Sequence, residues 1–164
     1  MTFSAGQKVT AALLNAIVTR QFIAKASAEA VTSSTVLQDD NDFQVTLDPG
    51  TYLVQAYIVA SAAEAGDLKT AWTHSGTMTV IRYCAGPAEA STDRQSTLMV
   101  HQAASETTAI PYGIDGTGTT LVRETLYVTC TATGTLKLQW AQNTSSATAT
   151  TLTTSSTLFS EKVA

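Results

Sequence analysis

Residues 118–142 read GTTLVRETLYVTCTATGTLKLQWAQ and contain two runs in which apolar and polar side chains alternate. The apolar positions that share a face are Leu126, Val128 and Cys130 in the first run and Leu136, Leu138 and Trp140 in the second. Successive side chains of a β-strand leave opposite sides of the pleat, so this period of two predicts strands with one buried face. The short turn at residues 132–134 predicts that the two strands form a hairpin.

The opposite faces of these two runs are polar but nearly uncharged. They carry Arg123, Thr125, Tyr127, Thr129 and Thr131 in the first run and Lys137, Gln139 and Ala141 in the second. Threonine favours strands because its β-branched side chain fits the pleated surface. Such an uncharged exterior is a first indication of function, because charged residues are depleted where proteins meet.

The chain has 164 residues, a length that predicts one domain. Its charge is low over the whole sequence and not only in these two runs. Only 13% of the residues are Asp, Glu, Lys or Arg, against roughly 25% in an ordinary globular domain. The mean hydropathy of +0.08 argues against disorder, since disordered chains are usually charged and poor in apolar residues. A surface that meets other protein over much of its area explains the low charge better.

Charge and hydropathy exclude two classes of partner. The nine basic residues are scattered singly in a chain of net charge −4, whereas nucleic-acid binding needs clustered Lys and Arg. Membrane attachment lacks support as well, because no apolar run approaches the roughly 20 residues of a spanning helix. The first residues, MTFSAGQ, do not resemble a signal peptide, which predicts synthesis in a cytoplasm.

Motifs for catalysis, cofactors or metals are not found in the sequence. His74 and His101 lie in no metal-ligand or catalytic pattern, and no GxSxG segment occurs. Residues 39–42 (DDND) lack the full calcium-loop pattern, so we interpret them as a solvated turn. Cys84 and Cys130 are interpreted as two small buried side chains, and a disulfide between them stays open. We therefore expect a protein that is not an enzyme and has no cofactor or metal.

The rest of the chain from residue 20 also reads as strand and turn. Further strands are predicted at 21–28, 43–47, 51–61, 68–74, 77–84, 96–102 and 151–163. Residues 51–61 differ from the others because both faces are largely apolar. Tyr52 and Ile58 share one face, while Leu53, Tyr57 and Val59 share the other. A strand that is apolar on both sides is covered on both sides, and in a small antiparallel domain the second cover is often another subunit.

Residues 1–19 differ from this β domain of residues 20–164. Thr10 is a plausible N-cap for a short helix, preceded by an extended stretch that contains Phe3. The apolar stripe of this helix consists of Leu13, Leu14, Ile17 and Val18. A helix of two turns is not stable alone in water, so it must dock either on its own domain or on a neighbouring subunit.

Four segments resemble a known family. Residues 48–57 (DPGTYLVQAY), 134–143 (GTLKLQWAQN) and 156–164 (STLFSEKVA) resemble the C1q/TNF-type jelly roll in the versions that tailed bacteriophages encode. Residues 3–15 (FSAGQKVTAALLN) resemble a leader common in phage tail and capsid-surface proteins. The resemblance covers most of the chain, and it departs from the family in having no collagen-like or coiled-coil stalk.

The resemblance implies an all-β antiparallel jelly-roll sandwich that forms a homotrimer, with Leu53, Tyr57 and Val59 in the subunit interface. It further implies a non-enzymatic structural protein on the exterior of a phage virion, most plausibly a capsid decoration protein. The N-terminal arm would then anchor the trimer on the major capsid protein or on tail subunits. Two alternatives stay open, which are a minor tail or tail-tip protein and a module that binds host-surface carbohydrate through Trp72, Tyr83 or Tyr112.

Overall fold

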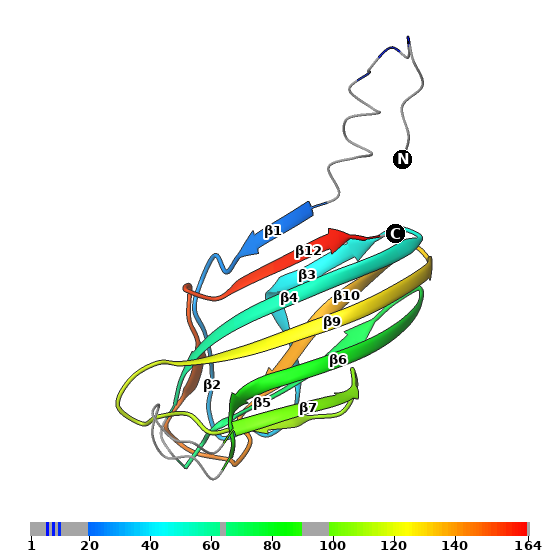
Figure 1. The fold of residues 1–164 in the computed structure, drawn as a ribbon. Coiled ribbons are helices and arrows are strands. Elements are labelled where there is room, and N and C mark those ends of the chain that lie inside the picture. Colours follow the sequence, from blue (N-terminus) through cyan, green and yellow to red (C-terminus); the bar gives the residue numbers. More distant parts are fainter. Residues whose placement is uncertain are drawn as a thin grey trace.

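A computed structural model describes Gly6, Lys8, Thr10 and residues 20–62, 65–89 and 99–163. Within these residues the chain is all-β, and two antiparallel sheets pack face to face as a sandwich (Figure 1). The predicted fold class is therefore confirmed. No helix long and apolar enough to cross a membrane occurs in the described part of the chain. The predicted anchoring residues Phe3, Leu13, Leu14, Ile17 and Val18 lie outside the described residues.

The strands divide unequally between the two sheets. The larger sheet has the order β1-β12-β4-β9-β6-β7, with β11 pairing both β4 and β2 at its side, and the smaller sheet has the order β3-β10-β5-β8. The strand bounds are β1 Arg20–Ala24, β2 Glu29–Val31, β3 Gln38–Leu47, β4 Gly50–Ser61, β5 Leu68–His74, β6 Thr77–Pro87, β7 Met99–Ser105, β8 Ile110–Tyr112, β9 Thr120–Ala132, β10 Gly134–Ala141, β11 Thr150–Leu152 and β12 Thr157–Lys162.

The core lies between the inner faces of the two sheets. Alternation places every second side chain of each long strand in it, as the sequence predicts for β9 and β10. Val54 and Ile58 of β4 are fully buried, and so are Leu138 and Trp140 of β10. Both cysteines are buried free thiols, in agreement with their interpretation as small apolar side chains.

The predicted hairpin of residues 118–142 is wrong. β9 pairs with β4 and β6 in the larger sheet, whereas β10 pairs with β3 and β5 in the smaller sheet. Thr133 therefore turns the chain through a corner from one sheet to the other. Both arrangements bury one face of each run, so the alternation that predicted the strands does not distinguish them.

Two further connections cross between the sheets at the same end. Residues 48–49 lead from β3 to β4, and residues 75–76 lead from β5 to β6. The corners contact one another, because Thr133 Oγ1 donates to Asp48 Oδ1 at 3.0 Å and Ser75 N donates to Thr135 O at 3.0 Å. This end of the sandwich is thus closed by three stacked corners.

Other predictions require correction in detail. Residues 39–42 belong to β3, whose register against β10 shifts in this stretch, and Asp40 there is almost fully buried, so they are not a solvated turn. The final strand predicted at 151–163 is divided into β11 and β12 by a turn, although Leu158 is the buried anchor that the sequence indicates. The short strands β2 and β8 were not predicted, because three residues are too few to display a period.

Candidate functional site

The outer face of the larger sheet is the most unusual surface of the described molecule. Large apolar side chains stand out from it on several strands, although no other part of the described chain covers them. The exposed large apolar side chains on this face are Phe22 of β1, Ile81 and Tyr83 of β6, and Leu121 and Tyr127 of β9. Monomeric soluble proteins rarely expose contiguous apolar patches of this kind, and such patches usually mark interaction sites.

The strand register places several of these side chains in rows across the sheet, with polar rows such as Gln55 and Thr125 between them. Leu53 of β4 lies opposite Tyr127 of β9, and Tyr127 in turn lies opposite Ile81 of β6. Along the same face, Val59 lies opposite Leu121. Directly opposed residues in an antiparallel pair have Cβ atoms about 5 Å apart, so their side chains touch.

The three predicted interface residues all lie on this face. Leu53, Tyr57 and Val59 alternate with fully buried residues along β4 and are partly exposed. Their position in β4, between β12 and β9, makes them the centre of the larger sheet. Two charged residues adjoin them, because Tyr57 lies opposite Arg123 of β9 and Leu53 lies opposite Glu161 of β12. Apolar side chains thus occupy most of both faces of this strand, as predicted, although Gln55 also lies on the outer face. The partner on that face stays a prediction.

The outer face of the smaller sheet is polar by contrast. There Lys137 and Gln139 of β10 both donate to the Asp39 carboxylate, at 3.4 and 2.8 Å. Thr46 of β3 and Thr135 of β10 lie opposite each other, with their hydroxyl oxygens 3.4 Å apart. This surface satisfies its own polar groups and exposes few apolar atoms, so the two outer faces of one sandwich differ in kind.

An open cavity of about 360 Å³ lies on the apolar face between β6, β7 and β9. Its lining consists of Tyr83, Cys84, Ala85, Gln102, Ala103, Arg123 and Thr125. Tyr83 is therefore accessible to a ligand. The other two predicted sugar-stacking residues are not, because Trp72 and Tyr112 are fully buried. Their assignment as ligand platforms is wrong, since their rings lie in the interior around a buried carboxylate.

That carboxylate belongs to Glu124 of β9, which is fully buried and surrounded by donors. Arg82 of β6 donates to it through Nε at 2.9 Å and Nη2 at 2.6 Å. Three further donors complete the set, which are Thr70 Oγ1 at 2.5 Å, Trp72 Nε1 at 2.6 Å and Tyr112 Oη at 2.9 Å. Arg82 and Glu124 both belong to the larger sheet, whereas Thr70, Trp72 and Tyr112 belong to β5 and β8 of the smaller sheet. The hydrogen bonds from these three side chains therefore join the two sheets across the core.

Electrostatics within this network follow from its geometry. Burial alone would raise the pKa of the Glu124 carboxyl, but the charge and hydrogen bonds of Arg82, with those of Thr70 and Trp72, hold that pKa below its ordinary value. Burial, and then the Glu124 charge, raise the pKa of the Cys84 thiol. Cys84 is accordingly a protonated, unreactive thiol at neutral pH. Both oxygens of the Glu124 carboxylate already accept hydrogen bonds from side chains of this protein, which favours a structural role for the network.

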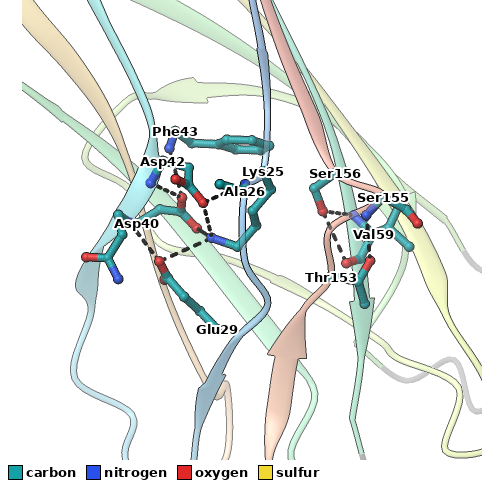
Figure 2. A network of polar contacts seen from close by, with 11 residues as sticks. Lys25, Ala26, Glu29, Asp40, Asp42, Phe43, Val59, Thr153, Ser155 and Ser156 are labelled. Atoms are coloured by element: carbon teal, nitrogen blue, oxygen red, sulfur yellow. Dashed lines mark hydrogen bonds and ion pairs between the residues drawn. The ribbon is translucent and has the colours of Figure 1, made fainter.

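A second polar cluster lies where the chain passes from β1 to β3 (Figure 2). The side chain of Lys25 is fully buried, and its ammonium contacts three carboxylates. Nζ lies 2.8 Å from Asp40 Oδ2, 3.2 Å from Glu29 Oε1 and 3.7 Å from Asp42 Oδ2. Oxygen atoms of Glu29, Asp40 and Asp42 lie within 4.8 Å of one another, and Lys25 supplies the positive charge among them.

Sequence reasoning missed both clusters, although a signal for the first exists. Glu124 occupies an inward position of an alternating strand, between the buried residues Val122 and Leu126. Arg82 occupies the equivalent position between Val80 and Cys84. A charged residue in the apolar phase of a strand indicates a buried ion pair, because an unpaired charge there is too costly.

Comparisons with known proteins add little to this description. No family model matches the chain, and no curated protein sequence matches it. Among solved structures, the "Gt strain" structure of infectious bursal disease virus is similar over 86% of this chain and 40% of its own, at 7% identity and a TM-score of 0.21. A VP2 subviral particle of the same virus covers 88% and 41%, at 7% identity and a TM-score of 0.22. The chain thus spans about 40% of the length of these solved chains, and such low scores carry no argument about function.

Proposed function

We propose that the protein is a non-enzymatic structural protein on the exterior of a tailed-phage virion, assembled as a homotrimer through the outer face of its larger sheet. The observation that carries the proposal is the set of large apolar side chains that the outer face of that sheet exposes. In an isolated subunit Leu121 would remain 54% exposed and Tyr83 49% exposed. Burial of such side chains against a neighbour is favourable by about 25 cal/mol for each Å² removed from water.

The dimensions of the face suit contact with two neighbours. Its principal path has six strands, β1-β12-β4-β9-β6-β7. With strands about 4.8 Å apart, the face is roughly 24 Å wide. A stable interface buries about 800 Å² on each partner. In a trimer around a three-fold axis, one half of the face meets each neighbour, and Tyr57 near the middle lies closest to the axis.

Placement on the particle follows from the resemblance of residues 3–15 to the leader of phage tail and capsid-surface proteins. Residues 1–19 dock on the major capsid protein, and the sandwich faces outward as a decoration. Synthesis takes place in the cytoplasm of the host, before the trimer joins the particle. Attachment to tail subunits, as a minor tail protein, is the alternative placement for the same trimer.

The oligomeric state of Tyr57→Glu tests the assembly. Wild-type protein should have a mass by light scattering of about 52 kDa, three times the 17.2 kDa of one chain. Tyr57→Glu places a carboxylate in the buried centre, so it should give a folded monomer with unchanged circular dichroism. Thr46→Glu on the polar face of the smaller sheet is the matched control and should remain trimeric. A wild-type protein that is monomeric at micromolar concentration would contradict the trimer.

A second candidate function uses the cavity beside Tyr83. An exposed aromatic ring next to Gln102, Arg123 and Thr125 offers both a stacking surface and hydrogen-bonding groups, which carbohydrate binding requires. The two candidates make opposite predictions for Tyr83→Ala. Loss of binding on an array of host-wall glycans, with the assembly intact, would favour the carbohydrate-binding module. If Tyr83→Ala no longer assembles, and the wild-type protein binds no glycan on the array, the trimer interface would be favoured.

A further inference from the structure

The cluster around Lys25 has features that an ordinary salt bridge does not require. We propose that Lys25 and Asp40 react spontaneously after folding to form an amide bond between Nζ and Cγ, and that Glu29 transfers the proton. Lys25 directly follows β1 of the larger sheet, and Asp40 belongs to β3 of the smaller sheet. The cross-link would therefore join the two sheets of the sandwich covalently.

The reacting groups are already in place. Lys25 Nζ lies 2.8 Å from Asp40 Oδ2, and both side chains are fully buried. A carboxylate C–O bond of about 1.2 Å then puts Nζ within about 4 Å of Cγ, close to the near-attack distance of about 3–3.5 Å. The backbone of Lys25 is fixed as well, because its N–H donates to Ser156 O at 3.1 Å. The amine thus has little freedom to leave the carboxyl group.

The other oxygen of Asp40 lies in a site that stabilises negative charge. Oδ1 accepts hydrogen bonds from Asp42 N at 3.0 Å and from Phe43 N at 2.8 Å (Figure 2). When the amine attacks Cγ, negative charge develops on this oxygen in the tetrahedral intermediate. Two fixed backbone donors aimed at such an oxygen are the arrangement that lowers the barrier in acyl transfer. Oδ2, which faces Lys25, is the oxygen that leaves.

Glu29 lies where a proton carrier is needed. Its Oε1 is 3.2 Å from Lys25 Nζ and also accepts from Asn41 N at 2.9 Å. Its Oε2 is buried and has no hydrogen-bond partner. An unsatisfied buried oxygen is costly in a purely structural cluster, so this one requires an explanation. A proton that Oε1 takes from the attacking nitrogen would neutralise this carboxylate and so lower the cost of leaving Oε2 unpaired.

The proposed step balances without any added reagent. The ammonium first gives one proton to Asp40 Oδ2, which leaves a neutral amine beside a carboxylic acid. The nitrogen then attacks Cγ, and Glu29 takes a second proton from it. Glu29 returns that proton to the departing hydroxyl at Oδ2. One N–C bond forms, one C–O bond breaks, and one water molecule leaves.

Burial favours the product over the ion pair. Two charges that have lost their hydration become a neutral amide, which is less costly to keep in an apolar environment. The surroundings are apolar on one side, since Nζ lies 5.9 Å from the centre of the Phe43 ring. Bulk water, which would reverse the reaction, has no access to a side chain of zero exposure.

Mass spectrometry under denaturing conditions tests the proposal. The wild-type protein should be lighter than its sequence by one water molecule, whereas Lys25→Arg, which has no amine at this place, should show its full mass. Lys137→Arg is the matched control, because the Lys137–Asp39 pair has the same chemistry but is exposed to water. This control should still lose one water. Full mass in aged wild-type protein overturns the cross-link, and this reading does not depend on how any variant folds.

Tryptic peptides locate the bond. An unmodified Lys25 is cleaved, which releases residues 21–25, and the next basic residue along the chain is Lys69. A lysine held as an amide is not cleaved, so one fragment of residues 21–69 lacking one water should replace the two peptides. Fragment spectra should join Lys25 to Asp40, and a bond to Glu29 or Asp42 would overturn the assignment. Glu29→Gln should slow or abolish the loss of water, and formation at the wild-type rate would overturn the role of Glu29.

Discussion

At the scale of single residues, the saturation of the Glu124 carboxylate is the most consequential feature of the core. Five hydrogen bonds from four side chains converge on two oxygens, and none of these groups has an exposed alternative. Polar groups satisfied in this way specify one arrangement of the two sheets, because any shift leaves a buried donor unpaired. Arg82 also donates to Thr70 O and Thr108 O, so its removal affects three segments together.

Arg82→Met should lower the free energy of unfolding by about 3–5 kcal/mol, because it leaves the Glu124 charge buried without its ion-pair partner. Urea denaturation followed by fluorescence measures the change. Arg20→Gln provides the matched control. It breaks the Arg20–Glu161 pair, whose side chains are 64% and 33% exposed, and should cost less than about 1 kcal/mol. An equal decrease in the free energy of unfolding for the two variants would show that the buried pair stabilises the protein no more than the exposed pair.

Glu124 also predicts a pH dependence of stability. Its pKa in the folded protein lies below the ordinary value of 4.5, so an unfolded chain takes up this proton first as the pH falls. The stabilisation is complete above about pH 4.5 and is lost progressively below it, by at most about 1.4 kcal/mol per pH unit. Unfolding free energies of the wild type should therefore fall more steeply than those of Glu124→Gln below that pH. Parallel profiles of the two proteins would contradict this.

At the scale of the elements, the three corners at one end determine how the sheets are joined. The corner between β9 and β10 lies so close to the β5–β6 turn that a side chain has no room at Gly134. A Cβ atom added there would lie 2.1 Å from Ser75 O. Gly76 faces it with a φ of 71° and meets the same restriction from Ala132 O and Thr133 O at 2.7 Å. Each corner therefore requires glycine where it touches the other.

Gly134→Ala should destabilise the protein by more than 1 kcal/mol, because backbone atoms rather than a flexible side chain must move. The melting temperature measured by circular dichroism gives the change. Gly66→Ala is the matched control, since a Cβ atom there would approach its neighbours only to 3.3 Å and at side-chain atoms. Equal melting temperatures for Gly134→Ala and the wild type would show that the backbone of the corner can shift at little cost in free energy.

At the scale of the whole molecule, the core of the described residues lies between the two sheets. Its described buried residues come from strands of both sheets. Under the proposed function, the predicted helix with Leu13, Leu14, Ile17 and Val18 serves attachment. A short amphipathic segment gains its stability from the surface on which it docks.

Deletion of residues 1–19 should leave a folded trimer with β-type circular dichroism that no longer binds particles lacking the native protein. Co-sedimentation of the purified protein with such particles measures binding, and light scattering confirms the trimer. An insoluble truncated protein would instead make the segment part of the core. Full retention of binding would transfer the docking surface to the sandwich itself.

The sequence by itself determined the fold class, most strands and the buried faces of β9 and β10. Alternation is a local property, because neighbouring side chains of an extended chain must leave opposite sides of the pleat. Leu126, Leu138 and Trp140 are buried where the pattern predicts them. The same reasoning located Leu53, Tyr57 and Val59 on one outer face of β4.

Only the tertiary structure decided which strands pair and which charges meet. β9 and β10 adjoin in sequence but lie in different sheets, because pairing depends on hydrogen bonds to distant strands that one alternating run does not specify. Glu124 meets Arg82 across 42 residues of sequence, and Lys25 meets Asp40 across 15. A buried charge loses its hydration, so it is stable only beside an opposite charge. The fold alone decides which opposite charge lies within contact distance.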